Sequence, residues 1–230
     1  MSKQKTHISY RRLRTPRVAA VAGIIFAILW GASYVLIQLT IPPIPLDKGE
    51  WWANQAGKIS LGLSLLPFAG IAFLWFMGVL RDRLGYLEDQ FFSTLFFGSG
   101  LLYLAMTFVS SSIAGGMLAI YALDPDLLSN SGAYLIARAV SIQITTVYAV
   151  RMSGMFMFVL GTIWMRTQVM PRWLAIVTYG LATALLISVG LTEWVMLVFP
   201  AWVFLVSVYT LILNWRAQSE KGQDGMTVDA

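Results

Sequence analysis

The stretch VAAVAGIIFAILWGASYVLIQLT, residues 18–40, contains no charged side chain. A membrane-spanning helix needs about 20 mostly apolar residues, because each residue rises about 1.5 Å and the hydrocarbon core is about 30 Å thick. Five further stretches approach or exceed this length, so the sequence predicts six spans: 18–40, 59–80, 91–113, 132–165, 173–191 and 194–214. We therefore expect an all-α fold, a polytopic transmembrane helical bundle.

The composition of the 230 residues agrees with this expectation. Hydrophobic residues make up 58% of the chain and charged residues only 12%, which no soluble domain of this size requires. The sequence predicts three regions: a basic cytoplasmic tail (1–17), one six-helix membrane domain (18–214) and a polar cytoplasmic tail (215–230), mobile from Ala217 onward.

Lysine and arginine are distributed unevenly between the two predicted faces of the membrane. With a cytoplasmic N-terminus, one face receives most of these residues and the other receives only Lys48, Lys58 and Arg138. By the positive-inside rule this asymmetry places both termini in the cytoplasm. The net charge of +5 is then mainly a topology signal, and the chain is expected to contact the lipid bilayer rather than nucleic acid.

Several chemistries are excluded by what the sequence lacks. It contains no cysteine, and its one histidine, His7, precedes the first span, so we expect no metal site and no cofactor inside the bilayer. No catalytic triad, zinc-protease motif, paired intramembrane carboxylate or glycine-rich phosphate loop is present. The sequence therefore favours a protein without catalytic residues.

Arg151 is the one costly side chain within the predicted hydrocarbon region. It lies about 22 Å above Arg166 at the cytoplasmic boundary, which places it in the outer half of the membrane. A mid-membrane arginine costs about 2.5–3.5 kcal/mol on insertion scales, so it needs a partner or water. Glu193 is the best-placed acid; Asp124, Asp126, Asp47 and Glu50 are alternatives, and a lipid phosphate is another.

Other polar side chains fall at or slightly above the level of Arg151. Depths estimated from the helical rise per residue therefore predict an outward-facing polar vestibule, closed on the cytoplasmic side by apolar packing. Its candidate ligand-binding or ion-pair residues are Arg151, Glu193, Tyr148, Gln143, Gln38, Tyr34, Ser110 and Thr107.

Three functions remain open on these residues. The first is a noncatalytic accessory subunit, or a module that binds a lipid or small anion, with other membrane subunits or a second copy as possible partners. The second is a small-solute transporter that uses the same vestibule. The third is a membrane enzyme, which is disfavoured because no base accompanies the lone serines.

Some local features predict how the helices bend and pack. Pro67 and Pro200 lie inside apolar runs and predict kinks, and the pair Gly115-Gly116 predicts a break in the third span. Small residues at helical spacing predict close helix contacts, namely Ala27 with Gly31 and Gly154 with Gly161.

The segment FMGVLRDRLG, residues 76–85, resembles part of a group of uncharacterised multi-pass bacterial proteins of actinobacterial type. The resemblance continues through Glu88-Asp89-Gln90-Phe91-Phe92 to residues 98–102, GSGLL. It implies a bacterial plasma membrane and carries no activity with it.

Overall fold

The computed structural model describes residues 15–40, 50–84, 90–124, 132–168, 170–188 and 193–226. Within these ranges the chain is all-α, without strands. The helices are α1 (Thr15–Gln38), α2 (Glu50–Leu84), α3 (Gln90–Leu123), α5 (Ala133–Gln143), α6 (Val150–Thr167), α7 (Arg172–Ile187) and α8 (Val198–Met226). A π-helical segment, Ile144–Ala149, joins α5 to α6, and a 3₁₀ turn, Glu193–Leu197, leads into α8.

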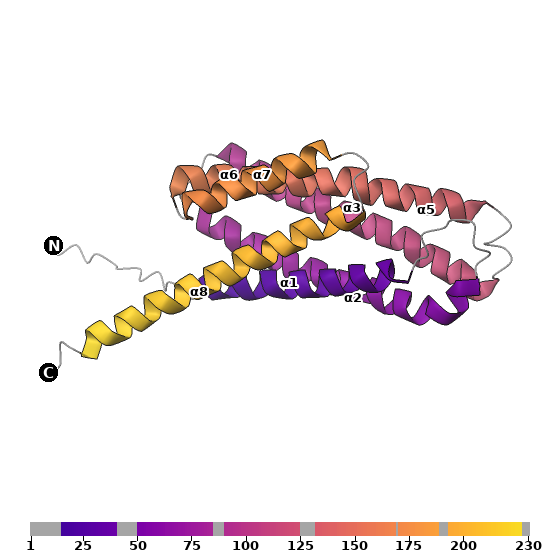
Figure 1. The fold of residues 1–230 in the computed structure, drawn as a ribbon, viewed down its shortest axis with the longest axis horizontal. Coiled ribbons are helices and arrows are strands. Elements are labelled where there is room, and N and C mark those ends of the chain that lie inside the picture. Colours follow the sequence, from indigo (N-terminus) through magenta and orange to yellow (C-terminus); the bar gives the residue numbers. More distant parts are fainter. Residues whose placement is uncertain are drawn as a thin grey trace, which may run out of the picture.

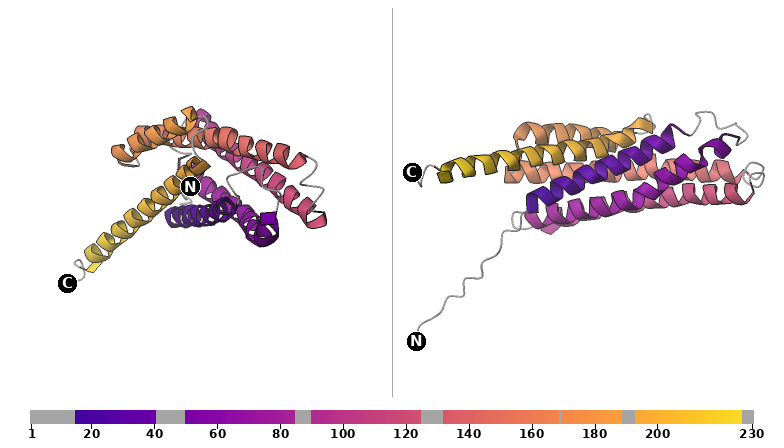
Figure 2. Two further views of the ribbon diagram at one scale, coloured as in Figure 1. Left: turned by 45° about the vertical axis from the view of Figure 1, so that its right-hand side comes forward. Right: turned by 90° about the horizontal axis from the view of Figure 1, so that it is seen from below.

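The helices form an elongated bundle in which α1 begins and α8 ends at the same end (Figure 1). Helix α1 packs against α2 and α8, whereas α6 packs against α7 and α3. Helix α8 crosses the bundle obliquely, and its C-terminal half projects beyond the other helices (Figure 2). We call the end where α1 begins the termini end, and the opposite end the far end.

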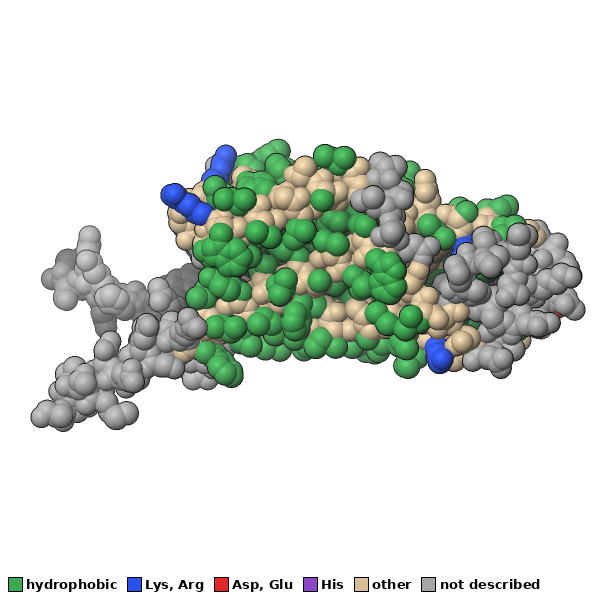
Figure 3. Space-filling view, in the orientation of Figure 1, with side chains coloured by type: hydrophobic (Ala, Val, Ile, Leu, Met, Phe, Trp, Pro, Cys, Tyr) green, Lys and Arg blue, Asp and Glu red, His purple; other side chains and the backbone are tan. Residues whose placement is uncertain are grey.

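Five helical stretches of the described chain are long and apolar enough to cross a membrane. They are Val18–Gln38, Gln55–Arg81, Gln90–Leu123, Ala133–Thr167 and Trp194–Leu213. Helix α7 is apolar but has only 16 residues, a length of about 24 Å. Figure 3 shows hydrophobic side chains over the middle of the drawn face and the visible Lys and Arg side chains near its ends, as a multi-pass membrane protein requires.

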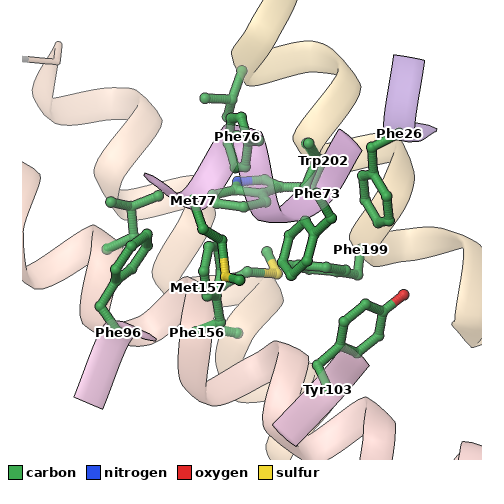
Figure 4. Packing of buried hydrophobic residues seen from close by; sticks show 14 of the residues in the cluster. Phe26, Phe73, Phe76, Met77, Phe96, Tyr103, Phe156, Met157, Phe199 and Trp202 are labelled. Carbon is green, nitrogen blue, oxygen red and sulfur yellow. The ribbon is translucent and has the colours of Figure 1, made fainter. Parts of the chain in front are cut away.

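A cluster of aromatic rings from five helices fills the centre of the bundle (Figure 4). Phe73 of α2 lies within ring contact of Phe26, Tyr103, Phe156 and Phe199, at centroid distances of 4.7–5.7 Å. All five rings are at most 2% exposed. We call this group the aromatic core.

Close helix contacts depend on particular glycines. At Gly154 an added Cβ would lie 3.1 Å from the Ala182 carbonyl oxygen of α7, so the predicted small-residue contact at this position is confirmed. A Cβ on Gly161 would meet Thr178 and Tyr179 only at ordinary distances of 3.6–3.7 Å. Gly31 has no described atom within 4 Å of such a Cβ, so the close contact predicted there is wrong.

Two predicted irregularities are absent from the described helices. Helix α3 continues without a break through Gly115-Gly116 to Leu123, so it extends as one helix past the predicted end of the third span at residue 113. Pro200 is the third residue of α8, where its missing N–H would have no helical acceptor in any case, so it starts this helix and does not kink a helix interior. Pro67 lies inside α2, which is continuous around it.

The helix boundaries also extend into the predicted tails. Helix α1 starts at Thr15, within the predicted basic tail, and α8 continues to Met226 through most of the predicted polar tail. The polar residues after Asn214 are compatible with helix because serine, glutamate, lysine and glutamine all tolerate it.

Candidate functional site

A cavity of about 170 Å³ lies between α1 and α2 on one side and α3, α5 and the π segment on the other. It is at the far end of the bundle, beyond the aromatic core: α1 and α3 each supply core rings first and cavity residues later along the chain. The lining comprises Trp30, Ser33, Tyr34, Ile37, Gln38, Leu63, Leu66, Thr107, Ser110, Ser111, Ala114, Met117, Arg138, Ser141, Ile142, Thr145, Thr146 and Met196.

One wall of the cavity carries a hydroxyl cluster that joins α3 to α5 and the π segment. The hydroxyl oxygens of Ser110 and Ser141 are 2.7 Å apart, and the Thr145 hydroxyl donates to the Ser110 hydroxyl oxygen at 2.7 Å. The Thr145 hydroxyl also lies 2.7 Å from the Ser141 carbonyl oxygen. Serine and threonine hydroxyls link helices in this way when no water is available.

Further cavity hydroxyls donate to backbone carbonyls. Thr107 donates to the carbonyl oxygen of Tyr103 at 2.9 Å, Ser111 to that of Thr107 at 2.6 Å, and Thr146 to that of Ile142 at 2.8 Å. Each of these bonds reaches back one turn on the same helix. Ser33 instead donates across to the Gly62 carbonyl oxygen of α2, at 2.6 Å.

The opposite wall is aromatic and apolar. The rings of Trp30 and Tyr34 stack with centroids 5.3 Å apart and an angle of 11° between their planes. Tyr34 also meets Trp194 edge to face at 6.5 Å. With Leu63 and Leu66 from α2, these rings give the cavity one apolar side, opposite the side rich in hydroxyl groups.

The cavity contains one described charged side chain, Arg138 of α5, which is half-buried. The cavity reaches the surface, because Ile142 is 39% exposed and Ser111 and Thr146 are half-exposed. A molecule could therefore enter from the surface and keep a polar group near Arg138.

Arg151 does not line this cavity. It is half-buried on α6, and its guanidinium donates to the Val147 carbonyl oxygen at 3.0 Å, within the π segment. A π segment departs from the regular hydrogen-bond ladder, and the Val150 N–H reaches back five residues to the Thr145 carbonyl oxygen. This bond holds the Arg151 guanidinium against the π segment, away from the cavity.

The predicted site residues thus divide into two groups. Tyr34, Gln38, Thr107 and Ser110 line the cavity. Arg151, Tyr148 and Gln143 do not; Tyr148 is 55% exposed and Gln143 is exposed as well. Glu193 begins the 3₁₀ turn, but its side chain lies outside the part of the chain that the structure describes, as do Asp126 and Asp47.

The sequence reasoning missed Arg138, Ser141 and Thr145. They are spaced three and four residues apart, so they share one helix face, and this spacing was the available signal. Among the described residues no group of three or more histidine, cysteine, aspartate or glutamate side chains is arranged to hold a metal ion. No protein-family model, curated protein or solved structure matches this chain.

Proposed function

We propose that this chain is a six-pass protein of a bacterial plasma membrane, with both termini cytoplasmic, that binds a lipid or small amphipathic molecule without catalysis. The observation that carries the proposal is the cavity itself. It has one apolar wall, one hydroxyl wall and a cation, and it reaches the surface. Such a site matches a molecule that has both a polar and an apolar part.

The size of the cavity limits what it can hold. An engineered protein cavity of about 150 Å³ holds one benzene molecule, so about 170 Å³ accepts a group of roughly that size. The site would therefore hold a headgroup and the start of a chain, while the rest of the molecule extends into the bilayer.

The aromatic core favours binding over transport. A solute leaving the cavity toward the termini end would have to pass Phe73, Phe156 and Phe199, which are at most 2% exposed. Dense packing of this kind would have to open for transport. An alternating-access transporter remains the alternative. Uptake of a solute into vesicles that contain the protein, but not into protein-free vesicles, is the observation that would favour it.

The test compares two arginines of the same helical rod. Wild type, Arg138→Gln and Arg151→Gln are each extracted with their native lipid, and the co-purifying molecules are identified by mass spectrometry. We expect a specific amphiphile to be retained by wild type and by Arg151→Gln, and to be depleted at least several-fold in Arg138→Gln. Equal depletion in both variants, or no enriched molecule in wild type, would refute binding at this cavity.

A further inference from the structure

We infer that the cavity selects a neutral amphiphile whose headgroup carries free hydroxyl groups, and rejects an anionic headgroup. This inference rests on the proposed function and names the ligand class for the same site. It follows from where the hydroxyl protons of the cavity wall point.

Seven hydroxyl groups of serine and threonine line the cavity, and each has a single proton to donate. Thr107, Ser111 and Thr146 direct theirs to carbonyl oxygens of their own helices, at 2.6–2.9 Å. Ser33 directs its proton to the Gly62 carbonyl oxygen at 2.6 Å. These four protons are therefore already engaged inside the protein.

The remaining three hydroxyls satisfy one another. Either Ser110 or Ser141 donates to the hydroxyl oxygen of the other, and each also lies 3.1–3.2 Å from the carbonyl oxygen of the other, which accepts the remaining proton. Thr145 donates either to the Ser110 hydroxyl or to the Ser141 carbonyl oxygen. Every proton of the cluster has an acceptor within the cluster.

The hydroxyl wall therefore offers lone pairs to a ligand and withholds protons. A ligand hydroxyl can donate to such an oxygen without breaking any existing bond. An anion would meet the same lone pairs, and could be bound by a hydroxyl only after that hydroxyl gave up its present hydrogen bond.

Arg138 complements this wall from the same helix as Ser141, one turn away. A hydroxyl group both donates and accepts, so a polyol headgroup can donate to the wall and accept from the guanidinium at once. An anion could accept from the guanidinium, but from none of the seven serine and threonine hydroxyls as they stand.

The test uses three synthetic probes with the same two short acyl chains: dioctanoylglycerol, its methyl ether at the free hydroxyl, and dioctanoyl phosphatidic acid. The full-length protein is held in phosphatidylcholine nanodiscs, and displacement of radiolabelled dioctanoylglycerol is measured at equal probe content of the bilayer. We expect the methyl ether and the phosphatidic acid each to compete at least tenfold more weakly than the glycerol.

Adjacent serines supply the matched variants. Ser111 lines the cavity, whereas Ser112 is exposed outside it and makes the same kind of bond, to the Phe108 carbonyl oxygen at 2.8 Å. We expect Ser111→Ala to weaken glycerol binding about three- to tenfold and Ser112→Ala to leave it unchanged. Thr146→Val, which keeps the side-chain shape, provides a second cavity variant if Ser111→Ala does not fold.

The outcomes separate this inference from the proposed function. If phosphatidic acid competes best and Arg138→Gln abolishes that preference, the hydroxyl selectivity is wrong while amphiphile binding stands. If the methyl ether matches the glycerol, the donor is irrelevant and the inference again fails. If no probe binds in a way that depends on the cavity residues, both proposals fail.

Discussion

A single hydrogen atom at Gly154 sets how closely α6 approaches α7. A Cβ there would lie 3.1 Å from the Ala182 carbonyl oxygen and 3.2 Å from the Leu185 Cβ, and neither backbone nor Cβ atoms can move aside as a side-chain end can. We expect Gly154→Leu to destabilise the bundle by about 1–3 kcal/mol, as overpacking does. Gly180 of α7 has no described atom within 4 Å of an added Cβ, so Gly180→Leu is the control.

Thermal unfolding in detergent measures both glycine variants. The expected result is a clear loss of unfolding free energy for Gly154→Leu and little change for Gly180→Leu. Equal stability of the two variants would show that α6 and α7 are not in close contact.

The side chains of Trp202 and Thr178 form a buried hydrogen bond between α8 and α7. The indole Nε1–H donates to the Thr178 hydroxyl oxygen at 3.0 Å, and both residues are at most 3% exposed. Thr178→Val keeps the shape but removes the acceptor, and we expect a loss of about 0.5–2 kcal/mol in unfolding free energy.

A double-mutant cycle with Trp202→Phe isolates this bond. Once the indole donor is gone, Thr178→Val should cost markedly less than it does in wild type. Thr94→Val is the control, since Thr94 is exposed and bonds only its own helix, to the Gln90 carbonyl oxygen. Additive effects in the cycle would contradict the bond.

Arg138 and Arg151 show which part of the site the sequence could predict. The rise per residue gave a depth for Arg151, but depth does not say which side of a helix faces the cavity. The two arginines are 13 positions apart, about 140° around an ideal α-helix, so they could not both face the same cavity. Which of the two arginines faces the cavity also depends on the π segment between them. No pattern in residues 144–149 indicated that this segment would be π-helical.

At the scale of elements, that π segment holds one residue more than the same turns of regular α-helix would. Removing one residue from it restores regular α-helix and leaves α5 and α6 facing nearly the same way as before. Tyr148 is 55% exposed, so its deletion removes little packing. We expect the deletion to leave Arg138 and Ser141 on the side that faces α3 and to retain amphiphile binding.

Probe binding and thermal unfolding of the Tyr148 deletion are measured together. The deletion should retain both binding of the glycerol probe and cooperative unfolding, because neither the cavity face of α5 nor the aromatic core is rotated. The substitution Tyr148→Ala keeps the register and should bind normally. Loss of binding by the deletion alone would mean that the wide π turn itself shapes the site.

The element predictions succeeded where length and apolar content decided the outcome. The positions of α1, α2, α3 and α8 follow from long apolar runs, and the glycine contact at Gly154 follows from helical spacing. Gly115-Gly116 failed as a break because a glycine pair permits a bend without requiring one.

At the scale of the whole molecule, the proposed six-pass topology requires α7 to cross the membrane although this helix is short. Its 16 residues span about 24 Å, several Å less than the hydrocarbon core, and local thinning of the bilayer can accommodate this difference. Without that crossing, α8 would run in the opposite direction and its C-terminal end would lie outside the cell. Six crossings with a cytoplasmic start place both chain ends inside.

The most direct test is labelling of single cysteines with a membrane-impermeant maleimide in intact cells, because the natural sequence contains no cysteine. Gln90 and Leu123 lie at opposite ends of α3, both exposed, and Ser219 lies near the end of α8. We predict labelling of Leu123→Cys only, with Gln90→Cys and Ser219→Cys reacting after permeabilisation. Labelling of Ser219→Cys in intact cells would contradict six crossings, and labelling of Gln90→Cys in place of Leu123→Cys would put the cavity in the cytoplasmic half of the membrane.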